Sequence, residues 1–153
     1  MEVNLVKLNS NAVIPTQGSK RAAGFDLYAC LRDDDTTRDV VYVEIAPHTT
    51  VKIGTGLAIQ PPNGYFGAIF ARSGLATKQG LRPANCVGVC DEDYTGEYIV
   101  AIHNDTDETH YIQHGDRIAQ LVFLPYLDVE FKETASLDKT ERGADGFGST
   151  GTN

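Results

Sequence analysis

The segment Val41-Tyr42-Val43-Glu44-Ile45 alternates aliphatic side chains with Tyr and Glu. In an extended chain successive side chains point to opposite faces, so Val41, Val43 and Ile45 share one face, as in a half-buried β-strand. Similar short runs, rich in β-branched and aromatic residues, recur along the chain. They predict strands at residues 3–8, 25–31, 40–45, 50–59, 65–71, 97–102 and 118–124.

Turn-forming residues separate these runs, and almost no sustained helical periodicity is present. Residues 61–64, 104–107 and 114–116 are rich in Pro, Gly, Asn and Asp, which favour tight turns. One short helix is predicted at residues 73–79, with Ser73 as its N-cap and Gly80 just past its end. The pattern therefore predicts an all-β fold, a distorted jelly roll or β-barrel with one short helix.

The chain of 153 residues is long enough for one domain with a substantial core. Its 13 Lys and Arg against 21 Asp and Glu leave a net charge of −8, which disfavours non-specific binding to nucleic acid or anionic membranes. No apolar run approaches the ~18 residues of a membrane span, and no secretory signal pattern is visible. We therefore expect a cytoplasmic protein whose partners include neither nucleic acid nor a membrane.

Cys30, Cys86 and Cys90 form an odd and sparse set, which predicts reduced thiols rather than a disulfide scaffold. A structural zinc site is not expected either, because Cys86 and Cys90 have no second Cys or His pair at finger spacing. His110 and His114 add only two ligands around an expected strand and turn.

Two segments differ from the rest in composition. Residues 32–39, RDDDTTRD, are most simply explained as a solvated acidic loop. Residues 134–153 become polar and then Gly-rich, which favours a frayed terminus. The same tail also carries an Arg, a Phe, a Ser and a Thr, the ingredients of a lid over a charged planar ligand. Composition alone leaves both interpretations open.

The acidic cluster Asp91-Glu92-Asp93-Tyr94-Thr95-Gly96 begins like a calcium-binding loop. That interpretation fails because the twelfth loop position is Ile102, where a bidentate Glu is required. A hairpin turn between two strands explains the glycine. Since the three carboxylates directly follow an apolar run, one of them is a candidate for a partly desolvated base.

Two further patterns suggest contacts to phosphate. Gly146-x-Gly148-x-x-Gly151 is not a dinucleotide fingerprint, because no strand leads into it and no helix follows it. Glycine-rich backbone still presents N–H groups to anions, and Arg142 lies just upstream. Arg72-Ser73-Gly74 stands at a strand-to-helix junction, where a phosphate contact and a plain helix cap are both open interpretations.

Five segments, taken together and in order, resemble the motif pattern of the trimeric deoxyuridine triphosphatases, the dUTPases. They are AGFDLYA (residues 23–29), ARSGLA (71–76), GVCDEDYTGE (88–97), GDRIAQLV (115–122) and RGADGFGSTG (142–151). Each segment is weak alone, whereas five in this order and spacing are specific. The resemblance implies a homotrimer of jelly-roll subunits with three active sites at the subunit interfaces.

The resemblance further implies hydrolysis of dUTP to dUMP and pyrophosphate, by attack of water on the α-phosphorus with Mg²⁺ on the triphosphate. Asp91 matches the carboxylate that activates this water, a role that suits phosphoryl transfer because the chemistry needs mainly positioning. Tyr94 matches the residue that packs on the deoxyribose and leaves no room for a 2′-hydroxyl. The resemblance implies further nucleoside contacts from Asn85, from the backbone of Val89, Cys90 and Ile99, and from Phe147 stacked on uracil.

The family's phosphate contacts match seven positions: Arg72, Ser73, Gly74, Gln120, Arg142, Ser149 and Thr150. Asp26 matches an acidic residue that touches the water shell of Mg²⁺, whose direct ligands would be phosphate oxygens and waters. With these roles, residues 134–153 become a flexible arm that closes an active site of the trimer. Residues 1–133 would form the catalytic barrel.

The sequence departs from the family pattern at Asp145, where Gly is usual, and more mildly at Ala71. A carboxylate at position 145 would weaken closure of the arm slightly.

One rival function is a dCTP deaminase of the same superfamily, which needs a Glu base in the pyrimidine pocket; the complete fifth motif argues against it. The other rival is a regulator that binds a protein partner through residues 32–39, and the intact catalytic motifs argue against a loss of catalysis.

Overall fold

The computed structural model describes residues 2–31, 42–85 and 87–144. Apart from one helix, the regular structure of these residues is entirely strand, which confirms the predicted all-β fold. The strands are β1 (Asn4–Lys7), β2 (Thr16–Gln17), β3 (Phe25–Tyr28), β4 (Tyr42–Ile45), β5 (Thr50–Gln60), β6 (Tyr65–Phe70), β7 (Leu81–Pro83), β8 (Gly88–Cys90), β9 (Glu97–Asn104), β10 (His110–Gln113) and β11 (Arg117–Pro125).

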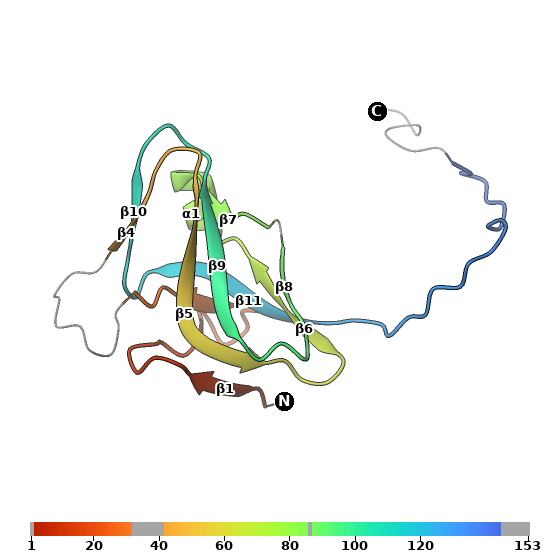
Figure 1. Ribbon diagram of the computed structural model, residues 1–153, viewed down its shortest axis with the longest axis horizontal. Helices are drawn as coiled ribbons and strands as arrows, with labels where there is room; N and C mark the ends of the chain where they lie inside the picture. Colours follow the sequence, from red (N-terminus) through yellow and green to blue (C-terminus); the bar gives the residue numbers. More distant parts are fainter. Residues whose placement is uncertain (1, 32–41, 86, 145–153) are drawn as a thin grey trace.

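Two antiparallel sheets make up the body of the fold (Figure 1). One sheet has the strand order β1-β5-β9-β7, the other has the order β2-β3-β11-β6-β8, and β4 pairs separately with β10. Strands that are neighbours in a sheet are often distant in the sequence, as β3, β11 and β6 are. This topology brings separate sequence motifs to one sheet.

The core lies between the sheets and is built by alternation along the longer strands. In β9, the side chains of Tyr98, Val100 and Ile102 are buried, whereas the residues between them are more exposed. Such alternation buries one face of each strand and leaves the other free. In β4, Val43 and Ile45 face inward as predicted, and Val41 lies outside the described residues.

Helix α1 (Ser73–Gln79) has the predicted bounds, but its first residue was assigned wrongly. Arg72, with φ −85° and ψ 126°, is the N-cap, and its side chain makes no capping hydrogen bond. Ser73 is therefore the first helical residue rather than the cap. Gly80 ends the helix in the left-handed conformation, φ 62°, and its N–H donates to the carbonyl of Leu75, as expected of a C-terminal glycine.

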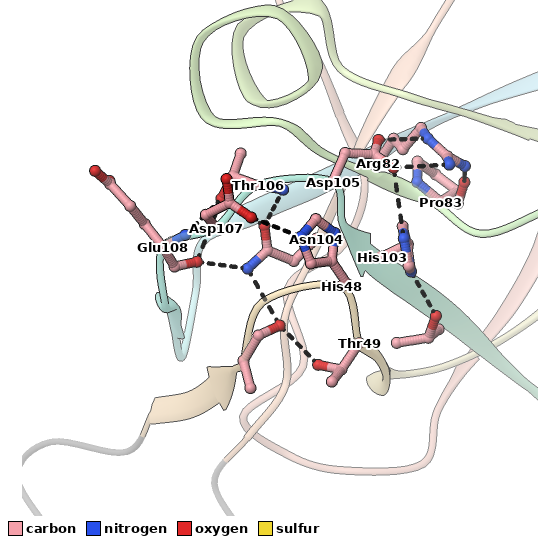
Figure 2. Close-up of polar contacts among 12 residues, drawn as sticks. His48, Thr49, Arg82, Pro83, His103, Asn104, Asp105, Thr106, Asp107 and Glu108 are labelled. Carbon is pink, nitrogen blue, oxygen red and sulfur yellow. Dashed lines mark hydrogen bonds and ion pairs between the residues drawn. The ribbon is translucent and has the colours of Figure 1, made fainter.

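Asn104 ties one end of the barrel together (Figure 2). Its buried side-chain Nδ2 lies 3.1 Å from the carbonyl oxygen of Ile45, 3.2 Å from that of Ala46 and 2.7 Å from that of Glu108. Its Oδ1 accepts from the N–H and the hydroxyl of Thr106. A buried amide with all its partners in place stabilises one arrangement of the two connections that it joins.

No bounds were predicted for four strands, namely β2, β7, β8 and β10, although strands were expected near His110 and on both sides of the acidic turn at residues 91–96. They contain two, three, three and four residues, respectively. A period of two cannot be recognised in so few residues. These strands are therefore set by pairing with longer neighbours rather than by their own pattern.

The chain leaves the barrel after β11. Residues 126–144 form no helix or strand, and every one of them is exposed. Figure 1 shows this segment, which we call the arm, running away from the sheets. In the part of the chain that the structure describes, no helix has the length and apolar character needed to cross a membrane.

Candidate active site

One of the two candidate hollows lies where β3, β11 and β6 are neighbours. Gln120 of β11 stands opposite Asp26 of β3 on one side and opposite Phe70 of β6 on the other. These strands and the start of α1 surround a hollow of about 640 Å³, which we call the phosphate hollow. Its lining contains all five barrel residues predicted to contact phosphate or the metal's water shell: Asp26, Arg72, Ser73, Gly74 and Gln120.

Asp26 organises the charges of the phosphate hollow. Its Oδ1 accepts from the Nε of Arg72 at 2.8 Å, and its Oδ2 accepts from a terminal nitrogen of Arg117 at 3.2 Å. The side chain of Asp26 is only 14% exposed and that of Arg72 only 25%, so this pair is partly shielded from solvent. Two guanidinium groups against one carboxylate leave the described lining with a net positive charge, which suits an anionic ligand.

Arg117 is a functional candidate that sequence reasoning missed. It lines the phosphate hollow, and its carbonyl oxygen also accepts from a terminal nitrogen of Arg72 at 3.3 Å. The available signal was its place within the motif GDRIAQLV, in which only Gln120 was singled out. The pairing of β11 with β3 makes Arg117 a neighbour of Asp26.

Gln120 is held in place by the backbone around it. Its Nε2 donates to the carbonyl of Ala71 at 2.9 Å. A Cβ added at Gly24 would lie 2.6 Å from the Oε1 of Gln120, so a side chain at position 24 would displace this amide. Gly24 therefore gives Gln120 the space to lie against the hollow.

The donor set of the phosphate hollow fits Mg²⁺ only through water. Both carboxylate oxygens of Asp26 already accept from arginines. Among the described residues, no group of three or more His, Cys, Asp or Glu side chains could hold a metal ion directly. Because Mg²⁺ keeps several waters and favours phosphate oxygens, a single carboxylate beside a phosphate site is sufficient for an outer-sphere contact.

The second hollow, of about 190 Å³, lies around β8 and the start of β9. We call it the nucleoside hollow, because its lining contains the predicted nucleoside residues Asn85, Val89, Cys90, Tyr94 and Ile99, together with Asp91. The predicted hairpin is wrong. Strand β8 pairs with β6, whereas β9 pairs with β5 and β7, so the segment between them connects the two sheets.

Tyr94 is braced within this connection. Its hydroxyl donates to the carbonyl of Glu97 at 2.9 Å, and its ring lies 6.2 Å from that of Tyr98. A Cβ at Gly96 would lie 2.5 Å from the Tyr94 hydroxyl, so only glycine leaves room for this ring. Tyr94 is thereby held at the rim of the nucleoside hollow while 43% of it stays exposed.

Three buried side chains of the nucleoside lining, Ile69, Cys90 and Tyr98, form what we call its floor, which contains a thiol. Burial raises the pKa of Cys90 to about 11. Burial also raises the pKa of the adjacent Tyr98 hydroxyl, and the neighbouring Cys90 adds to this shift. Among the described residues, neither Cys30 nor Cys90 forms a disulfide, and Cys86 lies outside them.

Comparison with known proteins identifies the family. The family model described as dUTPase matches residues 10–151. The chain belongs to the dUTPase family. It is 47% identical over 152 residues to the deoxyuridine 5'-triphosphate nucleotidohydrolase of Desulfitobacterium hafniense, covering 99% of this chain and 95% of the relative. It is 41% identical over 152 residues to the protein of that name from Ehrlichia canis, covering 97% and 94%.

A solved structure supports the jelly-roll architecture of this dUTPase family member. The dUTPase of Staphylococcus bacteriophage 80alpha, determined with dUPNHPP, superposes with a TM-score of 0.81 at 27% identity, and 99% of each chain is covered. The predicted jelly-roll fold is therefore confirmed.

The acidic turn of this dUTPase chain corrects one expectation. Of its three carboxylates, Asp91 and Asp93 are exposed, and Glu92 is half-buried. Glu92 accepts a hydrogen bond from the N–H of Gly64, which lowers the pKa of its carboxyl. Desolvation would instead raise the pKa of a carboxyl. In a single chain, therefore, no member of this turn is the desolvated base that the sequence suggested.

The two hollows remain separate in one chain, since no described residue belongs to both linings. Ile69 lines the nucleoside hollow and Phe70 lines the phosphate hollow, and consecutive strand residues point to opposite faces of the sheet. Arg142 lies on the exposed arm and lines neither hollow. Asp145, Phe147, Ser149 and Thr150 lie outside the described residues.

Proposed function

We propose that this member of the dUTPase family hydrolyses dUTP to dUMP and pyrophosphate, with Asp91 orienting and deprotonating the water that attacks the α-phosphorus. The family match over residues 10–151 supports the substrate and the reaction. The observation that carries the mechanism is the position of Asp91 on the wall of the nucleoside hollow. A carboxylate there is an available proton acceptor next to the bound nucleoside.

The nucleoside hollow would read the base and sugar. The side chain of Asn85 and the backbone of Val89, Cys90 and Ile99 supply the donors and acceptors for the uracil edge. The hollow is small, about 190 Å³, and this supports exclusion of larger or mismatched bases. Tyr94, fixed by its bond to the Glu97 carbonyl, would pack on the deoxyribose and exclude a 2′-hydroxyl.

The phosphate hollow would hold the triphosphate. Arg72 and Gln120 are already fixed by hydrogen bonds before any ligand arrives, so little reorganisation is needed at the moment of reaction. Ser73 and Gly74 lie beside them at the start of α1. Asp26 would contact the water shell of Mg²⁺, which supplies charge neutralisation on the triphosphate when it is bound.

A homotrimer would unite the two hollows, because the nucleoside hollow of one subunit can then face the phosphate hollow of another. The exposed apolar side chains of the arm support docking on a neighbouring subunit; they include Leu127, Val129, Phe131 and Leu137. We propose that residues 1–133 comprise the catalytic barrel and the first part of the arm, and that residues 134–153 are the flexible closing part, which brings Arg142, Phe147, Ser149 and Thr150 onto the bound nucleotide. We place the enzyme in the cytoplasm.

Pyrophosphate release from dUTP, compared with dTTP, dCTP and UTP and with and without Mg²⁺, tests this function. We expect fast release from dUTP alone and only when Mg²⁺ is present. Equal release from all four nucleotides would contradict the proposal. Release of ammonia from dCTP would favour the deaminase, but the one Glu of the described nucleoside lining, Glu97, already accepts from the N–H of Gly56 at 2.7 Å.

A further inference from the structure

Three segments that are distant in the sequence meet in a closed ring of hydrogen bonds beside the acidic turn. The N–H of Gly64 donates to Oε2 of Glu92 at 2.6 Å, and the hydroxyl of Tyr126 donates to the same oxygen at 2.8 Å. The N–H of Tyr126 donates in turn to the carbonyl of Gly64 at 3.1 Å. We call these three residues the clasp.

The three members of the clasp belong to three separate parts of the fold. Glu92 follows Asp91 directly, Tyr126 is the first residue after β11 and so the root of the arm, and Gly64 lies in the turn between β5 and β6. Asp91, Glu92 and Tyr126 also line one open cavity of about 710 Å³. The clasp thus joins the catalytic turn to the point where the arm leaves the barrel.

The clasp is strong because one carboxylate oxygen of Glu92 accepts two bonds, one from a backbone N–H and one from a hydroxyl. Charge-assisted hydrogen bonds are shorter and about twice as strong as neutral ones. In agreement with the geometry, the bond from Gly64 lowers the pKa of Glu92, and the bond to Glu92 raises the pKa of Tyr126. Within the turn itself, the bond from the Tyr94 N–H to the Asp91 carbonyl is longer, at 3.2 Å.

We propose that Glu92 and Tyr126 are positioning residues, which hold the Asp91 turn in the orientation that aims its carboxylate and hold the root of the arm against that turn. This role rests on the proposed function of Asp91. Removing the clasp leaves Asp91 present but free to turn away from the α-phosphorus, and misplacing a catalytic group by about 1 Å can cost up to ~100-fold in rate.

Three variants and one double variant test the clasp. Tyr126→Phe removes one hydroxyl from a half-exposed ring, and we expect kcat for dUTP to fall about fivefold with little change in KM. Glu92→Ala removes both bonds and should lower kcat about twentyfold. Glu92→Gln keeps an oxygen that can accept both bonds, and should restore kcat to within about twofold of wild type. The double variant Glu92→Ala with Tyr126→Phe should be no slower than Glu92→Ala, because the two residues act as one unit.

Matched controls separate positioning from general damage. Tyr111→Phe and Glu108→Ala alter an exposed tyrosine and an exposed glutamate away from the clasp, and both should leave kcat and Tm unchanged. Hydrogen exchange of the Gly64 amide gives a reading that does not need activity: it should accelerate in Glu92→Ala and stay slow in Glu92→Gln.

Wild-type kcat in Tyr126→Phe, additive losses in the double variant, or unchanged Gly64 exchange in Glu92→Ala would each overturn the positioning role. These results differ from a failure of the proposed function, which would appear as a wild-type chain that releases no pyrophosphate from dUTP. In that case the Gly64 exchange would still decide whether the clasp forms.

Discussion

The phosphate hollow and the nucleoside hollow are built by different means. In the phosphate hollow, Asp26 fixes Arg72 and Arg117 through side-chain ion pairs. The nucleoside hollow is lined by residues of β8, of β9 and of the connection between them, and the Asp91 in its lining is exposed. In one chain, therefore, the arginines of the phosphate hollow are already held by Asp26, whereas Asp91, the proposed base, lies exposed.

This difference indicates where each kind of substitution should act. A change in the phosphate hollow removes binding energy for the triphosphate. A change in the nucleoside hollow should alter the chemistry or the choice of nucleotide, because that hollow holds Asp91 and Tyr94, the proposed proton acceptor and sugar contact. Substitutions at Asp91, Arg72 and Tyr94 test this division.

Asp91→Asn should give the largest effect. The amide has the same shape but cannot take a proton, so kcat should fall about a thousandfold while KM stays within about threefold. Steady-state pyrophosphate release measures both constants. If the variant keeps a tenth of wild-type kcat, Asp91 is not the base.

Arg72→Gln should act on the triphosphate and leave the nucleoside hollow intact. We expect kcat/KM for dUTP to fall about a hundredfold, because a shielded charged donor is lost, and Arg117→Gln to cost about tenfold. Affinity for deoxyuridine, measured by calorimetry, should be unchanged in both. Arg82→Gln is the matched control, since Arg82 pairs with Asp105 and neither residue lines the phosphate hollow. A loss of deoxyuridine affinity in Arg72→Gln would contradict the proposal that one hollow binds the triphosphate and the other binds the nucleoside.

Tyr94→Ala should change selectivity more than rate. Without the ring, the space beside the sugar admits a 2′-hydroxyl, and the preference for dUTP over UTP should fall about tenfold in kcat/KM. Competition between the two nucleotides measures this ratio directly. An unchanged ratio would show that another residue excludes the ribose.

The smallest effect concerns the Cys90 thiol, whose reactivity rather than turnover is measured. Because burial raises its pKa from about 9 to about 11, the folded protein at pH 8 holds roughly a hundredfold less thiolate than the unfolded chain. Iodoacetamide should therefore label Cys90 about a hundredfold more slowly in the folded protein than in urea, as followed by mass spectrometry. The folded state holds this proton more tightly, so the associated stability is present below pH 9 and is lost as the pH rises through about 11. Equal labelling rates in the folded protein and in urea would mean that the reagent reaches Cys90 freely in the folded state.

The fold could be predicted from the sequence wherever a pattern had enough length to repeat. The alternation around Val43 and Ile45 and the Gly80 terminus of α1 are local properties, and the structure confirms both. The pairing partners of β8 could not be predicted, because three residues carry no readable period and pairing is decided by the longer β6. The supposed hairpin was wrong for that reason.

The candidate site followed the same rule. Residues within distinctive motifs, such as Arg72 and Gln120, were found, and the structure brings them into one hollow. Arg117 and Glu92 were missed because their roles come from partners about 90 and 30 residues away, Asp26 and Tyr126, which only the tertiary structure brings near. The joining of the two hollows between subunits stays a prediction.

Mixing two inactive variants tests the shared site most directly. Asp91→Asn subunits keep an intact phosphate hollow, and Arg72→Gln subunits keep an intact nucleoside hollow. The two variants are unfolded together and refolded in equal amounts. If different subunits supply the two hollows of a site, random assembly should leave both hollows intact in about a quarter of all sites. The account predicts recovery of about a quarter of wild-type pyrophosphate release from dUTP. Activity no higher than the average of the two parent variants would contradict it.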